Sequence, residues 1–143
     1  MTWNGVSREA FLLLITHLDF KDDDEKESRE FTGGLGIVEM YKHRANHDYA
    51  KYYIVKDNEK ILVTIMLQRD GSLIYFTTKD FTPNLTRGVI RSVRNLANKT
   101  VRKVDNIFVK TAPWYAEAIR FVKIIGFTQI RVNKYDIQWI YER

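Results

Sequence analysis

A chain of 143 residues with 45% hydrophobic and 13% aromatic side chains has the size and apolar content of one packed globular domain. The lack of cysteine excludes disulfides and thiolate metal sites, and no apolar run approaches the ~18 residues of a membrane span, so we expect a cytoplasmic protein with no membrane partner. Residues 1–48 have a net charge of −4 and residues 49–143 a net charge of +9, which predicts an anionic partner for the C-terminal two-thirds.

The acidic N-terminal part predicts two helices. Ser7 is a good N-cap, and apolar residues at helical spacing follow it, so an amphipathic helix is expected over residues 7–18. Seven carboxylates lie in residues 19–30, but this segment lacks the sixth-position glycine of an EF-hand calcium loop. An exposed helix with an aspartate cap is therefore favoured over residues 23–31, and the glycines from Gly33 onward end it.

Residues 36–47 give no clear period, because they fit a helical face or the start of a strand equally well. His43 and His47 lie four residues apart, which on a helix places both rings on one face, as metal ligands are placed. No glutamate follows His43 as in zinc proteases, and no third ligand is evident. We therefore expect an exposed pair of histidines and no metal site.

From Tyr49 onward the hydrophobic period changes to two residues. Strands are predicted over residues 52–55 and 61–67, joined by a turn at residues 57–59. The dipeptide Asp70-Gly71 is a strong hairpin turn, and a third strand follows over residues 73–78. This antiparallel meander leads into an alternating strand and helix pattern, which argues for a mixed sheet with helices on its faces.

A basic helix is predicted over residues 89–99. Its apolar residues form one stripe, and Arg87, Arg91 and Arg94 fall on another face at i, i+4 and i+7. The helix should therefore pack on the sheet and present guanidinium groups, which suit bidentate phosphate contacts, to solvent.

The end of the chain predicts a further strand, a helix and a closing hairpin. Residues 104–110 suit a buried, parallel strand, and Pro113 is expected at the first turn of a helix over residues 113–125. Gly126 should be its left-handed C-cap. Strands over residues 127–131 and 137–141 should be joined by a turn at residues 133–136.

This order of elements is similar to that of the GCN5-related N-acetyltransferases, the GNAT family. The most specific local match is Ala118-Ile-Arg-Phe-Val-Lys-Ile-Ile-Gly126-Phe127, which resembles the family segment A-I-x-L-Y-E-K-x-G-F. The general likeness covers about residues 50–132. It implies an α+β fold with a mixed, mostly antiparallel sheet, one splayed parallel strand pair and helices on both faces, in a single acetyltransferase-like domain over residues 1–143.

Within the family the chain looks closest to small bacteriophage proteins of the T7-like internal virion type. These also have an aromatic strand followed by threonine or serine, a very basic helix and an Ile-Arg-Phe-x-Lys-x-Ile-Gly helix. The likeness implies a viral protein of the host cytoplasm or the virion.

The family resemblance implies that acetyl-CoA lies between the strands over residues 73–78 and 104–110, and that an amine attacks its thioester. Backbone N–H groups at the start of the following helix would hold the pyrophosphate. By this resemblance Tyr115 is the candidate acid, and Asp80, which lies near the expected cleft, is the candidate base. The candidate cofactor-binding residues are Phe76, Thr77, Thr78, Leu85, Thr86, Arg87, Gly88, Val89 and Arg91.

The chain departs from the family at several motif positions. Phe81, Asn84 and Thr86 stand where the pyrophosphate motif has Gln or Arg, Gly, and Gly or Ala. Val122 replaces the usual tyrosine, and Tyr115 stands where an asparagine often opens the helix.

Two hypotheses therefore remain open. The chain is either an N-acyltransferase or an inactive acetyltransferase-fold protein that binds an acidic protein or nucleic acid through Arg87, Arg91 and Arg94. A dedicated nucleic-acid module is less well supported, since neither a helix-turn-helix nor an aromatic RNA-binding strand is evident.

Overall fold

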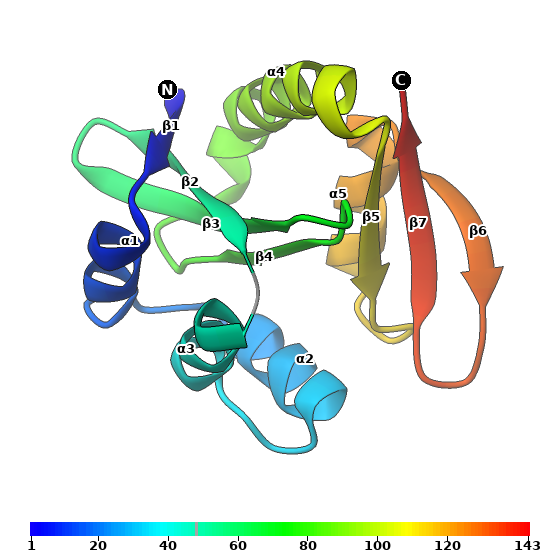
Figure 1. Ribbon diagram of the computed structural model, residues 1–143, viewed down its shortest axis with the longest axis horizontal. Coiled ribbons are helices and arrows are strands. Elements are labelled where there is room, and N and C mark those ends of the chain that lie inside the picture. Colours follow the sequence, from blue (N-terminus) through cyan, green and yellow to red (C-terminus); the bar gives the residue numbers. More distant parts are fainter. Residues whose placement is uncertain (48) are drawn as a thin grey trace.

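The computed structural model describes residues 1–47 and 49–143, without the side chain of His47 (Figure 1). Its elements in chain order are β1 (Thr2–Val6), α1 (Arg8–Ile15), α2 (Asp22–Thr32), α3 (Ile37–His47), β2 (Ala50–Asp57), β3 (Lys60–Gln68), β4 (Leu73–Thr77), the 3₁₀ turn η1 (Pro83–Leu85), α4 (Thr86–Val104), β5 (Asn106–Thr111), α5 (Ala116–Ile125), β6 (Thr128–Val132) and β7 (Ile137–Glu142).

The strands form two antiparallel sheets that meet at one point. The first sheet has the order β1-β2-β3-β4 and the second the order β5-β7-β6. Strands β4 and β5 run parallel and touch at a single bridge between Ser72 and Phe108, beside a 2.9 Å hydrogen bond from Phe108 N–H to the Gly71 carbonyl oxygen. Beyond this bridge the two strands diverge (Figure 1). The mixed α+β fold with one splayed parallel pair is therefore confirmed.

Gly71 allows this close meeting of the two sheets. Its φ is +94°, and a Cβ at this position would lie 2.5 Å from the carbonyl oxygen of Asn106. Only glycine accepts both the backbone conformation and the contact. The predicted turn dipeptide thus also sets where the splay begins.

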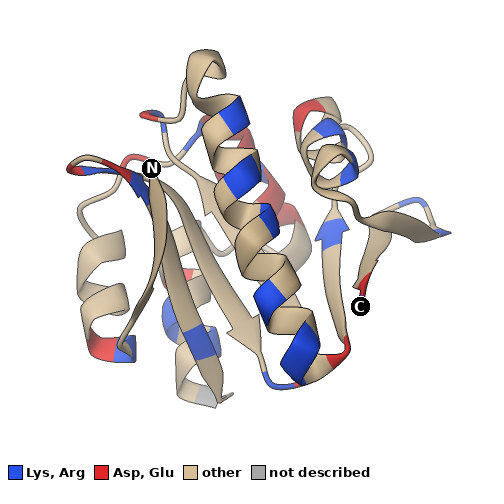
Figure 2. Ribbon diagram, turned by 90° about the horizontal axis from the view of Figure 1, so that it is seen from above, with Lys and Arg blue, Asp and Glu red and all other residues tan. Residues whose placement is uncertain are grey.

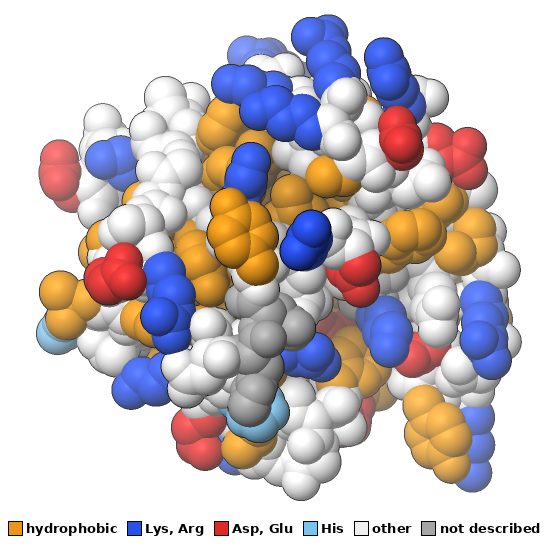
Figure 3. Space-filling view, viewed as in Figure 1, with side chains coloured by type: hydrophobic (Ala, Val, Ile, Leu, Met, Phe, Trp, Pro, Cys, Tyr) orange, Lys and Arg blue, Asp and Glu red, His pale blue; other side chains and the backbone are white. Residues whose placement is uncertain are grey.

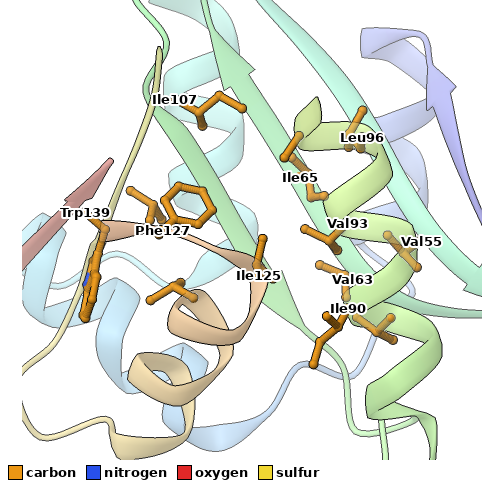
Figure 4. Close-up of a cluster of buried hydrophobic side chains, with 14 of the residues drawn as sticks. Val55, Val63, Ile65, Ile90, Val93, Leu96, Ile107, Ile125, Phe127 and Trp139 are labelled. Carbon is orange, nitrogen blue, oxygen red and sulfur yellow. The ribbon is translucent and has the colours of Figure 1, made fainter. Parts of the chain in front are cut away.

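Helices cover both faces of the sheets and bury two hydrophobic clusters. One cluster joins β2–β5 and β7 to α4 and α5, and Figure 4 shows Val93 and Leu96 of α4 directed at Val63 and Ile65 of β3. The other joins the opposite face of the first sheet to α1 and α3, with Phe11 and other fully buried side chains. The apolar stripe predicted for the basic helix is therefore confirmed, since it is the face of α4 that packs on the sheet.

The N-terminal part differs from the sequence prediction in three places. Helix α1 starts as predicted, with the Ser7 hydroxyl accepting the Ala10 N–H at 3.1 Å, but ends at Ile15. The aspartate cap predicted for α2 was wrong, because Lys21 precedes the helix and makes no side-chain cap bond; Gly33, with φ of +73°, ends the helix as expected. The edge strand β1, which pairs with β2, was not predicted, and α3 is the helical one of the two alternatives left open for residues 36–47.

The C-terminal part shows two corrections. Helix α4 begins at Thr86, before the predicted start at residue 89, so most of the residues expected to hold the pyrophosphate form its first turn. Helix α5 begins at Ala116, so Pro113 does not lie in its first turn. The segment before it instead forms a turn, closed by a 3.1 Å bond from Tyr115 N–H to the Ala112 oxygen, which directs Tyr115 inward.

The described part of the chain has neither a membrane-spanning helix nor a metal-binding cluster. None of the helices there combines the length and hydropathy that crossing a bilayer requires. Across residues 1–47 and 49–143 there is also no group of three metal-ligating side chains. The side chain of His47, one half of the histidine pair, lies outside the described residues.

Candidate functional site

The open end of the splay is bordered by two strand edges. Thr78 N–H donates to the Leu62 oxygen of β3 at 3.0 Å. Because backbone groups along a strand alternate in direction, residues 73, 75 and 77 of β4 direct their N–H and C=O groups away from β3 and toward β5. On β5, Phe108 N–H faces β4, and the same alternation turns the backbone groups of residues 110 and 112 toward the gap. Each strand therefore presents unpaired backbone groups to the gap unless another element supplies partners.

Helix α2 supplies partners at the far end of the gap. The carboxylate of Asp24 accepts the backbone N–H of Thr77 and, at 2.7 Å, its hydroxyl. Lys21 N–H donates to the Thr77 oxygen at 3.0 Å. Across the gap, Glu27 Oε2 accepts the N–H of Ala112 at 2.9 Å. Two carboxylates one turn apart on α2 thus hold the ends of β4 and β5.

Tyr115 joins the same cluster from α5. It is the N-cap residue of that helix, is buried, and its hydroxyl donates to Asp24 Oδ1 at 2.5 Å. Burial first, and then the Asp24 carboxylate, raise the pKa of Tyr115 above its ordinary value. The phenol is therefore protonated at neutral pH, as a proton donor must be.

Burial raises the pKa of both carboxyl groups. Burial raises the pKa of Glu27 to about 8. The hydrogen bond from Ala112 N–H lowers this pKa, and the charges of Asp24 and Glu30 raise it further. Burial also raises the pKa of Asp24, although hydrogen bonds from Tyr115 and Thr77 oppose the shift. Within the described residues neither carboxylate forms an ion pair. Burying such a pair costs stability, and perturbed pairs of this kind are typical of catalytic sites.

A groove opens beside the cluster, on the α2 side of the gap. Its volume is about 1040 Å³, and Glu27, Glu30, Tyr75 and Lys110 are among its lining residues. On the other side of the sheet, between α4 and α5, the corresponding space is an apolar cavity of about 30 Å³. The splay is therefore accessible from the α2 side and sealed from the α4–α5 side.

The predicted cofactor residues of β4 divide between the two faces. Thr77 reaches the gap, as described. Phe76 instead packs in the opposite cluster, with its ring 5.5 Å from that of Tyr41. The Thr78 hydroxyl donates to the Ile61 oxygen at 2.7 Å. The structure thus brings one of these three side chains to the splay.

The predicted residues at the start of α4 lie in three environments. Val89 is fully buried in the core, and Leu85 and Thr86 are half-buried. Gly88 packs against Met1, because a Cβ there would lie 2.9 Å from the Met1 sulfur. Arg87 and Arg91 are exposed on the helix surface.

Asp80, the predicted base, is exposed in the turn after β4 and has no hydrogen bond or ion pair to the described residues. The structure brings Glu27 to the splay instead. The sequence analysis missed both Asp24 and Glu27, because it interpreted all seven carboxylates of residues 19–30 as solvent-exposed. Their i, i+3 spacing places them on one face of α2 and was the one available signal.

The residues of the splay fit the pantetheine arm and the phosphates of acyl-CoA. The outward N–H and C=O of Tyr75 and Lys110 have no partner in the described chain, which suits the amides of an extended pantetheine arm. The first turn of α4 has no acidic residue and no side-chain cap, and the Arg87 and Arg91 guanidinium groups suit phosphate. The Lys21 and Asp24 contacts lie across the splay between these two sets of groups, so acyl-CoA would bind both only if the first turn of α2 moved.

Comparisons with known proteins agree on the fold. No protein-family model and no curated protein matches the chain. Among solved structures, the GNAT domain of PAT from S. lividans has a TM-score of 0.67 at 10% identity, covering 99% of this chain and 89% of that domain. A chimera of the spermidine N-acetyltransferase SpeG from Vibrio cholerae has a TM-score of 0.64 at 12% identity, covering 99% and 94%. The ribosomal-protein-S5-alanine acetyltransferase from Vibrio fischeri has a TM-score of 0.59 at 13% identity, covering 98% and 91%.

At such low identity these likenesses show the fold, which is that of the GNAT acetyltransferases, as the sequence predicted. None of these three structures is a bacteriophage protein, so the likeness to phage virion proteins stays a prediction from the sequence alone.

Proposed function

We propose that the protein is an N-acyltransferase that moves an acyl group, such as acetyl, from acyl-CoA to an amine. The observation that carries the proposal is the position of Glu27. Its carboxyl group has a pKa of about 8, lines the groove, and lies at the end of the splay beside the Asp24–Tyr115 hydrogen bond. Burial of this carboxyl group without an ion pair costs stability, and such perturbed groups are common at catalytic sites.

Each residue has a distinct role in this proposal. Bound acyl-CoA would supply a thioester carbonyl carbon for attack by the amine. Glu27 accepts the proton that the attacking amine loses, and a base with a pKa near the working pH is the most effective for this transfer. Tyr115 supplies the proton that the leaving sulfur takes up. In the structure this hydroxyl donates to Asp24, so the movement of α2 that binding would require must also free the proton for the sulfur.

The α2 side of the groove offers carboxyl groups to an amine acceptor. Glu27 and Glu30 place two carboxyl groups along its α2 side. Glu30 is held in place by a 2.6 Å bond from the Trp114 indole N–H. Two of the structures with the same fold are named for spermidine and for alanine as acceptors, which supports an amine acceptor.

Thermal unfolding with and without acetyl-CoA tests the proposal. A ligand at 100 times its Kd stabilises a fold by about 2.7 kcal/mol, or roughly 5 to 10 °C for a chain of this size. Arg87→Ala should reduce this shift, because it removes an exposed guanidinium at the start of α4. The matched control is Arg131→Ala, which removes the same charge from the exposed strand β6.

Asp24→Ala removes the hydrogen bonds that hold α2 across the splay. If millimolar acetyl-CoA shifts the melting temperature of neither the wild type nor this variant, the proposed function is contradicted. An equal loss of shift in the Arg87 and Arg131 variants would contradict the placement of the phosphates.

A further inference from the structure

The exposed face of α4 has a composition that acyl transfer does not explain. Eight of its residues are exposed: Arg87, Arg91, Arg94, Asn95, Asn98, Lys99, Arg102 and Lys103. Six are cations, two are asparagines, and none is acidic or apolar. Figure 2 shows basic positions along the whole helix, and Figure 3 shows Lys and Arg side chains gathered at that end of the molecule. Solvated helices usually mix charges of both signs.

These cations are not neutralised by the rest of the described chain. No acidic residue among those described lies within ion-pair distance of any of them. Arg94 donates to the carbonyl oxygens of Ile124 and Ile125 at the end of α5, and Lys99 lies 5.3 Å from the Trp3 ring. The remaining four cations make no side-chain hydrogen bond or ion pair with the described residues and face solvent.

The cations are also arranged in a line. At 100° per residue, Arg87, Arg91, Arg94 and Arg102 fall within roughly 80° of the helix circumference and extend over about 22 Å of its axis. A single CoA pyrophosphate at the start of the helix occupies only the Arg87 end of that length. The remainder matches a ligand with repeated phosphates.

We propose that α4 is a binding surface for the phosphate backbone of duplex nucleic acid. An acidic protein partner would require apolar anchors, and this face offers none. Single strands are held largely by stacking on aromatic rings, and the exposed positions of α4 include no aromatic residue. Regularly spaced phosphates need only the cations and amide donors that are present.

Fluorescence anisotropy with a labelled 20-base-pair DNA duplex, over a series of salt concentrations, tests this proposal. Neutralising four to five phosphates gives a slope of about −4 for log K against log salt. The variant Arg102→Gln with Lys103→Gln removes two cations far from the cofactor site. It should reduce the slope by about 2 and weaken binding at least tenfold at low salt, while its thermal shift with acetyl-CoA remains that of the wild type.

The matched control is Lys42→Gln with Lys134→Gln, which removes two exposed cations from α3 and the β6–β7 turn. It should retain the wild-type slope. Equal slopes in the two double variants, or no salt-dependent binding by the wild type, would overturn the proposal. Equally tight binding of poly-L-glutamate would overturn the assignment to nucleic acid in favour of an acidic protein.

Discussion

Replacing Glu27 by glutamine is expected to stabilise the folded protein at pH 8.5 and to leave its stability at pH 4 almost unchanged. The folded pKa of Glu27 is about 8 against an ordinary value of 4.5, so the folded state binds more protons between these values. Wild-type stability therefore falls as pH rises from about 4.5 to 8. Glutamine does not titrate, and its amide oxygen can still accept the Ala112 N–H.

The difference should reach a few kcal/mol at pH 8.5, since each pKa unit corresponds to about 1.4 kcal/mol. Urea unfolding of the wild type and of Glu27→Gln at the two pH values measures it. Glu30→Gln is the matched control, because Glu30 lies almost one turn later on α2 and is exposed. A Glu27→Gln effect that is the same at both pH values would show that the carboxyl group is not perturbed as described.

Replacing Asp24 by alanine should increase the affinity for acetyl-CoA at least tenfold. The Asp24 carboxylate accepts three hydrogen bonds, two from Thr77 and one from Tyr115, which hold α2 across the splay. Hydrogen bonds to charged groups contribute about 1.5 to 3 kcal/mol each. Since about 1.4 kcal/mol changes the fraction of molecules with α2 displaced tenfold, losing these bonds should raise the apparent affinity by at least that factor. The substitution also frees the Thr77 N–H to pair with a ligand.

Isothermal titration with acetyl-CoA measures this affinity. Asp23→Ala is the matched control, because it removes the neighbouring carboxylate, which is exposed. Circular dichroism should show that the Asp24 variant is folded. Tyr115→Phe removes one of the three bonds and should give a smaller gain. Identical affinities in the Asp23 and Asp24 variants would show that α2 does not restrict access to the splay.

The parts of the fold that depend on local pattern were predictable from the sequence. The stripe of Val89, Val93 and Leu96 defined the packed face of α4, and Asp70-Gly71 marked the turn before β4. The strand β1 was missed because it is a short edge strand without an alternating pattern, and it is formed by pairing with β2, about 50 residues later. Local pattern carries no information about such a partner.

The site was less predictable than the fold, because its contacts are long-range. The hydrogen bond between Tyr115 and Asp24 joins residues 91 positions apart in the sequence, and that between Ala112 and Glu27 joins residues 85 positions apart. Tyr115 was found through the family resemblance. Asp80 was chosen for its nearness in sequence to the end of β4, whereas burial, which sequence alone does not give, distinguishes Glu27 from its neighbours.

The dependence of acyl transfer on pH tests the central claim most directly. The measurement is the rate of CoA thiol release from acetyl-CoA, with spermidine and an alanyl peptide as acceptors, between pH 6 and 9.5. The wild-type rate should rise through an apparent pKa of about 8, and Glu27→Gln should lose that rise and at least a hundredfold in rate. No thiol release at any pH by the wild type or Asp24→Ala, or the same profile in Glu27→Gln, would contradict the claim.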